Sequence, residues 1–200
     1  MKKIISKSQF LELNKKSAKS MFKNVALKKK ANNILFQADK YRWIHQTKWL
    51  GEPILNLPQD VFAIQELIWE SRPDYIIEIG VAWGGSMLFN SMMLDYIKGK
   101  KVIGVDVFIP DNLKKRLSVH KKLSRKFQLI QGDSLSDEVL DKVKKIIKGS
   151  KKVMVILDSH HTHKHVLKEL QLYSKFVSKN NYLICCDTII NFLPNQKHRK

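Results

Sequence analysis

A short apolar strand runs through a glycine-rich turn into a helix in the stretch Asp74-Tyr75-Ile76-Ile77-Glu78-Ile79-Gly80-Val81-Ala82-Trp83-Gly84-Gly85-Ser86. Glycine lets a backbone turn tightly and approach a ligand with no Cβ in the way. The spacing Gly-x-x-x-Gly-Gly differs from the Gly-x-Gly-x-x-Gly of dinucleotide-binding proteins and from phosphate-cradling loops that end in Gly-Lys-Ser/Thr. We therefore expect a cofactor to sit against this turn without being held there by a phosphate group.

Apolar runs alternate with helix-length segments after this turn. The further runs lie at residues 101–106, 127–131, 153–158 and 181–187, and the helix-length segments lie at 86–97, 112–124, 136–148 and 163–178. Continuous apolar runs are typical of parallel strands that are buried on both faces. The pattern predicts an α/β fold with a doubly wound, mostly parallel sheet, in which ligands bind beyond the carboxyl ends of the strands.

The first 50 residues differ in composition from the rest of the chain. They contain 13 basic and two acidic residues, so they carry a net charge of +11. Their loosely spaced apolar residues predict one or two surface helices. We divide the chain into a basic helical N-terminal extension, residues 1–48, and an α/β domain, residues 49–200. Residues 48–58 contain a glycine and two prolines and predict a turn and an extended segment that lead into this domain.

The charge of the whole chain raises the question of an anionic partner. Its 200 residues include 37 basic and 18 acidic ones, a net charge of +19. However, 32 of the basic residues are lysine, whereas planar readers of phosphates and bases tend to be arginine. Because no RNA-binding or zinc-finger pattern is present either, nucleic acid is a disfavoured partner. We interpret the surplus as a lysine-biased composition, and an anionic glycan, lipid or protein partner is the alternative.

The cysteines and the apolar runs indicate a cytoplasmic protein. Cys185 and Cys186 are adjacent and form neither a disulfide framework nor a CxxC pair. No apolar run approaches the ~18 residues that a transmembrane helix needs. We therefore expect no transmembrane segment.

Acidic residues stand at or just past four strand ends. Asp106 suits a carboxylate that accepts hydrogen bonds from two ribose hydroxyls. Asp133 can accept a hydrogen bond from an adenine amino group or cap the next helix. Asp158 and Asp187 close neighbouring strands, so both carboxylates can converge on one cation. Oxygen ligands favour Mg²⁺ or Mn²⁺ over Zn²⁺.

Four histidines, at positions 160, 161, 163 and 165, follow Asp158. If a helix begins near residue 162, His161 and His165 fall near one face, and a Zn²⁺ or Fe²⁺ site of carboxylate and imidazole is an alternative. We expect His160 and His163 to be solvated. His161 is the candidate for a general base or a group close to the metal.

Over residues 41–193 the chain resembles the cephalosporin hydroxylase family. The matching motifs are Trp49-Leu50-Gly51, Pro58-Gln59-Asp60, Gln65-Glu66, Pro73-Asp74, Ile77-Glu78-x-Gly80, Gly84-Gly85-Ser86, Gly132-Asp133-Ser134, Leu157-Asp158-Ser159 with His161 and His165-Val166, Glu169-Leu170 with Tyr173, and Asp187-Thr188. Despite the name, members of this family resemble O-methyltransferases that depend on S-adenosylmethionine, including enzymes that act on rhamnosyl groups.

The resemblance implies a Rossmann-like class I methyltransferase fold and an O-methyltransferase activity. The acceptor it implies is a hydroxyl of a sugar, a glycan or a small natural product, as in polysaccharide biosynthesis. It implies that Asp158 and His161 are catalytic and that Asp158 and Asp187 hold Mg²⁺ or Mn²⁺. The residues that it implies for S-adenosylmethionine are Glu78, Gly80, Trp83, Gly84, Ser86, Asp106 and Asp133.

Two departures from the family pattern stand out. Members usually carry a second acidic or amide ligand beside the fifth-strand aspartate, where this chain has Cys186 and Thr188. Members also continue with two further strands, whereas 13 residues follow Asp187. Either the chain is shorter than its relatives and lacks the last strands, or another element completes the sheet edge.

Three other functions compete with this one. The first is RNA binding or RNA methylation through the basic N-terminal region. The second is a non-catalytic, methyltransferase-like binding subunit. The third is a hydrolase that uses the histidines with Zn²⁺ or Fe²⁺. The N-terminal helices can either form a homo-oligomer or cover the pocket.

Overall fold

The computed structural model describes residues 5–192, and these fall into two compact units, residues 5–43 and residues 44–192. The division of the chain at residue 48 stays a prediction. No helix in the described part of the chain is long and apolar enough to cross a membrane.

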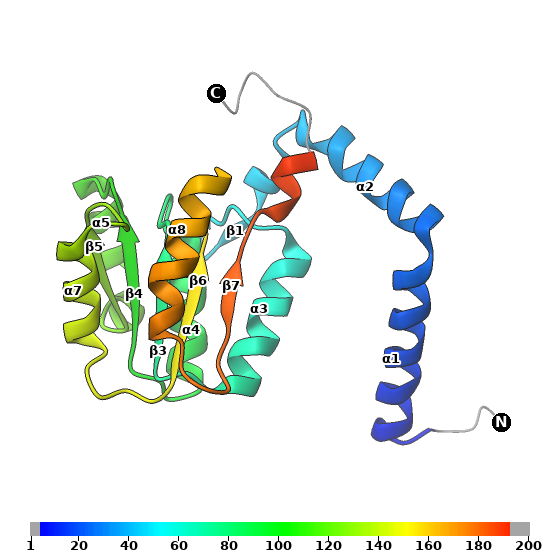
Figure 1. The fold of residues 1–200 in the computed structure, drawn as a ribbon, viewed down its shortest axis with the longest axis horizontal. Coiled ribbons are helices and arrows are strands. Elements are labelled where there is room, and N and C mark those ends of the chain that lie inside the picture. The colour runs from blue at the N-terminus through cyan, green and yellow to red at the C-terminus, as the bar shows by residue number, and fades with distance from the viewer. Residues whose placement is uncertain (1–4, 193–200) are drawn as a thin grey trace. The chain divides into compact units, whose positions relative to one another are not determined.

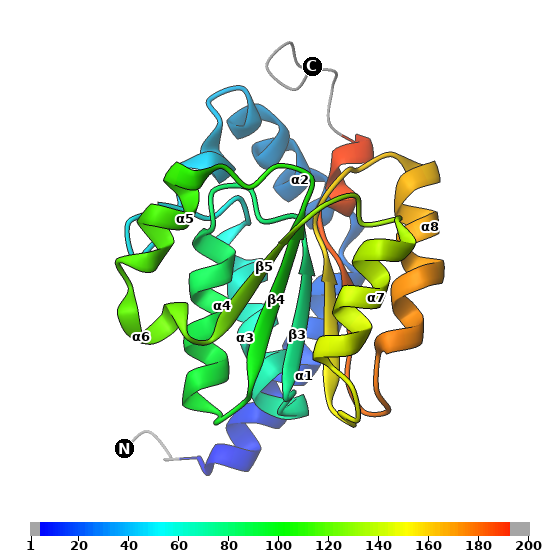
Figure 2. The ribbon, with the colours of Figure 1, turned by 90° about the vertical axis from the view of Figure 1, so that its left-hand side faces the viewer.

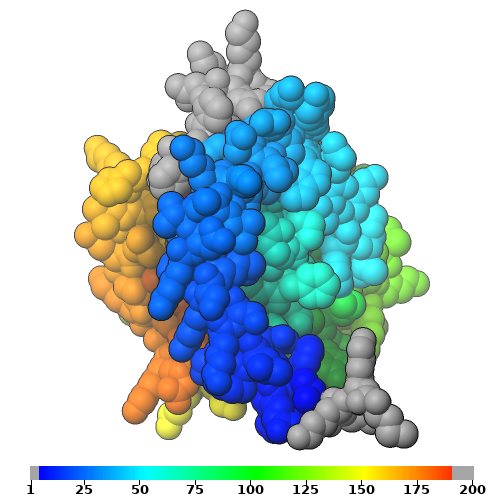
Figure 3. All heavy atoms as spheres, turned by 90° about the vertical axis from the view of Figure 1, so that its right-hand side faces the viewer, coloured from blue at the N-terminus to red at the C-terminus, as the bar shows by residue number. Residues whose placement is uncertain are grey.

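Two helices form most of the N-terminal unit, α1 (Lys7–Lys23) and α2 (Val25–Asp39). Ser6 caps α1 in a capping box, because its Oγ accepts from Gln9 N–H (3.2 Å) while the Gln9 side chain accepts from Ser6 N–H (2.9 Å). Asn24 ends α1 and caps α2 by accepting from Leu27 N–H (3.0 Å). The side chains of both helices, blue in Figure 3, are mostly exposed.

A five-stranded parallel sheet organises residues 44–192 (Figure 1). Its strands are β3 (Tyr75–Ile79), β4 (Lys101–Asp106), β5 (Phe127–Gln131), β6 (Val153–Leu157) and β7 (Leu183–Cys185). The order is β5-β4-β3-β6-β7, and every neighbouring pair is parallel. The chain thus builds outward from β3 to β5, then returns to the other side of β3 with β6. The predicted doubly wound fold is confirmed, and its strand order reverses between β3 and β6, where such folds bind ligands.

Helices cover both faces of this sheet (Figure 2). On one face lie α3 (Pro58–Ser71), α4 (Gly85–Tyr96), α5 (Asp111–Ser118) and α6 (Lys121–Ser124); on the other lie α7 (Asp137–Ile146) and α8 (His163–Tyr173). Strand residues alternate between the faces, so Ile76 joins the apolar cluster under α3 and α4, whereas Ile77 and Ile79 join the cluster under α7 and α8.

Shorter elements connect these layers. They are η1 (Trp43–Gln46), the antiparallel pair β1 (Lys48–Trp49) and β2 (Glu52–Pro53), η2 (Ser174–Phe176) and η3 (Thr188–Phe192). The tight turn between β1 and β2 places Leu50 at φ +50° and Gly51 at φ +91°. The Trp49 ring packs edge-on against Phe89 of α4, with ring centroids 5.1 Å apart, which fixes the hairpin to the body of this unit.

Two elements differ from the sequence prediction. The helix expected over 112–124 is split into α5 and α6, because the backbone leaves the helical region at His120, which has φ −79° and ψ 64°. The strand expected over 181–187 covers three residues, Leu183–Cys185, and pairs only with β6 among the described residues. Asp187 lies at φ +56°, outside the extended region, and so cannot continue that strand.

Candidate active site

The turn after β3 follows a path that glycine alone allows at its first position. Gly80 has φ +99°, and a Cβ there would lie 1.9 Å from the carbonyl oxygen of Asp158. Gly84, at φ +87°, would bring a Cβ to 2.8 Å from the Leu117 side chain. The turn therefore packs directly on the end of β6, and it brings together the strand ends on both sides of the reversal.

Asp106, at the end of β4, holds this turn in place. Its Oδ2 accepts from the backbone N–H groups of Val81 (2.8 Å) and Ala82 (3.1 Å), and its Oδ1 accepts from Phe108 N–H (3.0 Å). A carboxylate oxygen has two acceptor positions, so Oδ1 keeps one for a ligand hydroxyl. Trp83 and Phe108, 53% and 69% exposed, offer apolar rings to a flat ligand in the same region.

Glu78 is buried on the α4 side of the sheet. Its side chain is 1% exposed, Ser86 Oγ donates to its Oε1, and Asn90 Nδ2 donates to its Oε2 (2.8 Å). Burial raises the pKa of Glu78 from 4.5 to about 7, against the lowering effect of the two hydrogen bonds. Sequence reasoning expects Glu78 and Ser86 to contact a cofactor; in this structure they contact each other, and their roles toward a cofactor stay predictions.

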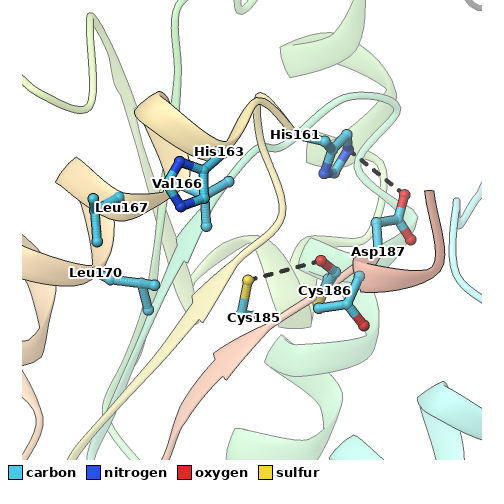
Figure 4. A pocket seen from close by; sticks show the side chains of 9 residues that line it. His161, His163, Val166, Leu167, Leu170, Cys185, Cys186 and Asp187 are labelled. Atoms are coloured by element: carbon cyan, nitrogen blue, oxygen red, sulfur yellow. Dashed lines mark hydrogen bonds and ion pairs between the residues drawn. The ribbon is translucent and has the colours of Figure 1, made fainter. Parts of the chain in front are cut away.

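Asp158, His161 and Asp187 converge beyond the ends of β6 and β7. One ligand atom from each lies within 4.8 Å of the other two. His161 Nε2 lies 3.6 Å from Asp187 Oδ2, and Figure 4 shows the imidazole pointing toward that carboxylate. Two carboxylates and one imidazole at this spacing form a donor set that fits a divalent cation.

The electrostatics of this cluster also suit a cation. Burial, and next the negative charge of Asp187, raise the pKa of Asp158 to about 7, although Asn56 Nδ2 donates to its Oδ2 (3.2 Å). Asp187 adopts the left-handed conformation, which aspartate tolerates better than most residues but which still costs free energy. The repulsion between the two carboxylates is what a bound cation would relieve.

Sequence reasoning did not assign roles to two residues of this cluster. Asn56 is buried and reaches Asp158 from the segment before α3. Asp60, in the first turn of α3, has an exposed side chain, yet loss of solvation and then the charge of Asp187 raise its pKa. Only weak indications of these roles are present in the sequence. Asn56 is a single asparagine between two leucines, and Asp60 is an acidic residue at a helix start, where its favourable interaction with the helix dipole explains it equally well.

A pocket of roughly 160 Å³ opens beside the cluster, between α8 and β7 (Figure 4). Its lining residues are His161, His163, Val166, Leu167, Leu170, Cys185, Cys186, Asp187 and Thr188. Burial and the charges of Asp158 and Asp187 raise the pKa of the Cys186 thiol, so this thiol stays protonated and is a poor metal ligand. The pocket is therefore lined by apolar side chains of α8 (Val166, Leu167 and Leu170) and by two residues of the cluster, His161 and Asp187.

The other histidines stay outside the cluster. Among the described residues, His161 is the single histidine grouped with the two aspartates. His165 Nε2 instead lies 3.0 Å from Glu169 Oε1, and the exposed His160 ring packs edge-on against His165. This geometry does not support the alternative site built on both His161 and His165.

Asp133 does not cap α7. Its Oδ1 accepts from Leu135 N–H (2.9 Å), whereas Ser136 is the N-cap of α7, its Oγ accepting from Val139 N–H (3.3 Å). The capping alternative for Asp133 is therefore wrong, because the helix starts three residues later than that alternative requires. Its predicted contact with adenine stays a prediction.

The glycine turn, Asp106 and the carboxylate cluster thus share one edge of a doubly wound sheet, at its strand-order reversal. Folds of this kind are those of Rossmann-like methyltransferases, and solved structures agree. The chain matches an apo structure of CmcI (TM-score 0.53, 21% identity, covering 74% of this chain and 60% of that one). It also matches a candidate caffeoyl-CoA O-methyltransferase from Staphylococcus aureus (TM-score 0.54, 17% identity, 86% and 82% covered).

The chain belongs to the rhamnosyl O-methyltransferase/CmcI family, whose family model matches residues 41–200. This confirms the resemblance drawn from the motifs. The rhamnosyl O-methyltransferase of Mycobacterium leprae (strain TN) is 28% identical over 155 residues, which cover 74% of this chain and 63% of the relative. That of Mycobacterium bovis (strain BCG / Pasteur 1173P2) is 27% identical over 151 residues, 74% and 60% covered. The chain thus spans somewhat less than two thirds of the length of these curated relatives.

Proposed function

We propose that the protein is an O-methyltransferase that takes its methyl group from S-adenosylmethionine, is assisted by a divalent cation, and acts on a sugar hydroxyl. The observation that carries this proposal is the convergence of Asp158, His161 and Asp187 beside the glycine turn. Family membership supports it, as do the names of the relatives, rhamnosyl O-methyltransferases. A CmcI structure with magnesium and S-adenosylmethionine shares the fold (TM-score 0.52, 23% identity, 74% and 60% covered).

The residues at the turn fit the donor. Asp106 Oδ1 has an acceptor position left for a ribose hydroxyl, and the exposed rings of Trp83 and Phe108 can pack against adenine. The carboxylates of Asp158 and Asp187 at this edge of the sheet suit a positively charged sulfonium. When bound, S-adenosylmethionine supplies an already activated methyl group, so the protein mainly has to align an acceptor oxygen with it.

The cluster prepares that acceptor oxygen. The carboxylates of Asp158 and Asp187 would hold a divalent cation, which would supply a lowered pKa to an acceptor hydroxyl next to it. His161, whose Nε2 faces Asp187, takes the hydroxyl proton as general base. Asn56 donates to Asp158 and so fixes the orientation of that carboxylate. The pocket between α8 and β7 would hold the rest of the acceptor.

The side chains of the cluster restrict which divalent cation can bind. The carboxylate oxygens of Asp158 and Asp187 favour Mg²⁺ or Mn²⁺ over Zn²⁺, and His161 stays free of the cation so that its Nε2 can accept the proton. The proposal also includes a cytoplasmic location, which the two free thiols of Cys185 and Cys186 support. The proposed partners are a sugar or glycan acceptor rather than nucleic acid, with the N-terminal helices as the candidate surface for a homo-oligomer.

Methyl transfer from tritiated S-adenosylmethionine to a panel of glycosides that includes rhamnosides tests the function. We expect transfer that is lost on chelation and restored by Mn²⁺ or Mg²⁺. Asp187→Asn should lose activity, whereas Asp141→Asn, an exposed aspartate on α7, should keep it. Full activity in chelator would remove the cation from the mechanism. A folded protein that transfers methyl to RNA and to no glycoside would replace the proposed substrate class.

A further inference from the structure

Glu169 is a buried carboxylate that the proposed chemistry does not use. It lies on α8 and is 1% exposed. Three polar groups from different places in the chain lie within hydrogen-bond distance of its Oε1: Ser134 Oγ (2.6 Å) and Ser159 Oγ (2.8 Å), which both donate to it, and His165 Nε2 (3.0 Å). A buried carboxylate is costly unless it is hydrogen-bonded, and these donors meet that cost.

The two serines belong to the two loops that carry Asp133, a proposed cofactor contact, and Asp158, a proposed metal ligand. Ser134 follows Asp133 in the loop after β5, and Ser159 follows Asp158 in the loop after β6. In the sheet, β4 and β3 separate these two strands. The loops are therefore not held together by strand pairing, and Glu169 joins them from the helix behind.

A second contact holds the first loop to the same helix. Tyr173, one turn further along α8, donates from its hydroxyl to the Ser134 carbonyl oxygen (2.9 Å) and is fully buried. Glu169 and Tyr173 thus bind the Ser134 side chain and backbone from one helix face. Ser134 itself is 6% exposed, so the loop after β5 is anchored at this residue.

We propose that Glu169 is a positioning residue that sets the spacing between the cofactor loop after β5 and the cation loop after β6. This inference rests on the proposed function, since it assigns the two loops to donor and cation. Glu169 touches neither ligand; it acts through Ser134 on the residue next to it, Asp133, and through Ser159 on Asp158. Its loss releases both loops at once and weakens both binding sites. A carboxylate that only fills space in the core would change stability alone.

The test compares three variants by binding rather than by activity. Glu169→Ala removes all three hydrogen bonds, Glu169→Gln keeps an acceptor oxygen of similar position, and Val143→Ala removes packing from the same apolar cluster without touching either loop. S-adenosylhomocysteine is titrated by calorimetry and Mn²⁺ by electron paramagnetic resonance. Outer hydrogen-bond partners of a metal site typically contribute about 10–100-fold in affinity.

We expect Glu169→Ala to lower both affinities about tenfold or more, Glu169→Gln to restore most of the loss, and Val143→Ala to lower stability with both affinities unchanged. Wild-type affinities in folded Glu169→Ala overturn the inference. A folded wild-type protein that binds neither ligand would instead refute the proposed function.

Two single-serine variants keep the inference falsifiable if Glu169→Ala does not fold. Ser134→Ala should lower the affinity for S-adenosylhomocysteine more than that for Mn²⁺, and Ser159→Ala should show the reverse order. Amide hydrogen exchange without ligand provides an independent readout, in which Leu135 should exchange faster in Ser134→Ala and His161 in Ser159→Ala. Equal effects of both variants on both ligands, with unchanged exchange, contradict the proposal.

Discussion

Replacing Glu78 with glutamine should flatten the pH dependence of the protein's stability. Burial raises the pKa of Glu78 from 4.5 to about 7 in the folded protein. Because the folded state then binds the proton more tightly than the unfolded chain, the contribution of this proton to stability is complete below about pH 4.5 and is lost as the pH rises through about 7. At ~1.4 kcal/mol per pKa unit, the whole effect is about 3 kcal/mol.

Glutamine is a suitable replacement because the surroundings can accept it. Its carbonyl oxygen can take the hydrogen bond from Ser86 Oγ. Its amide can donate to Asn90 Oδ1, a buried atom with no hydrogen-bond partner among the described residues, once the Asn90 amide turns over. The glutamine is therefore neutral at every pH, and the number of unsatisfied buried atoms stays the same, because Asn90 Nδ2 takes the place of Oδ1.

Urea unfolding of both proteins at pH 5 and pH 8, with a chelator to keep cations from Asp158, measures the effect. We expect the stability of the wild type relative to Glu78→Gln to fall by about 2–3 kcal/mol between these pH values. Glu70→Gln, at an exposed position on α3, should track the wild type at both pH values. The reasoning is refuted if the wild type and Glu78→Gln lose the same stability over this range.

Three further substitutions test the site. Gly80→Ala places a Cβ 1.9 Å from the Asp158 carbonyl oxygen and should abolish folded protein, measured by yield and circular dichroism. Gly51→Ala, where a Cβ meets nothing within 4 Å, should still fold. Comparable yields of the two variants would contradict the close approach of Gly80 to Asp158. Asp106→Ala should weaken S-adenosylhomocysteine binding by about 1.5–3 kcal/mol in calorimetry, and unchanged affinity would remove it from the donor site. His161→Ala should lower methyl transfer about 100-fold or more and change its pH profile, while donor affinity stays the same; an unaltered profile would rule out its role as base.

The fold could be predicted because its signals are local. The strands from β3 to β6 are short, mostly apolar runs, and the segments between them have helical length and period, so the order of elements favours a doubly wound sheet. The last strand was predicted two residues too long at each end. At its carboxyl end Cys186 extends the apolar run in sequence, whereas the left-handed backbone at Asp187 turns the chain away. The break between α5 and α6 lies at the non-helical backbone of His120, which periodicity does not encode.

The site was predictable only in part, for a related physical reason. Parallel strands end at one edge, so Asp158 and Asp187 had to lie near each other. The hydrogen bonds around these residues join remote parts of the chain. Asn56, which donates to Asp158, is 102 residues from it in sequence, and Ser134 is 35 residues from Glu169. Contacts at such separations follow from packing of the whole sheet and helices, which single-sequence patterns do not report.

A crystal structure of the protein with S-adenosylmethionine and Mn²⁺ shows whether donor and cation bind together at this edge of the sheet. We expect an anomalous Mn²⁺ peak between Asp158 and Asp187, close to His161, with the ribose of the donor against Asp106 and the glycine turn. Donor or Mn²⁺ bound elsewhere on the fully folded protein, or this edge empty at saturating concentrations of both, would contradict it.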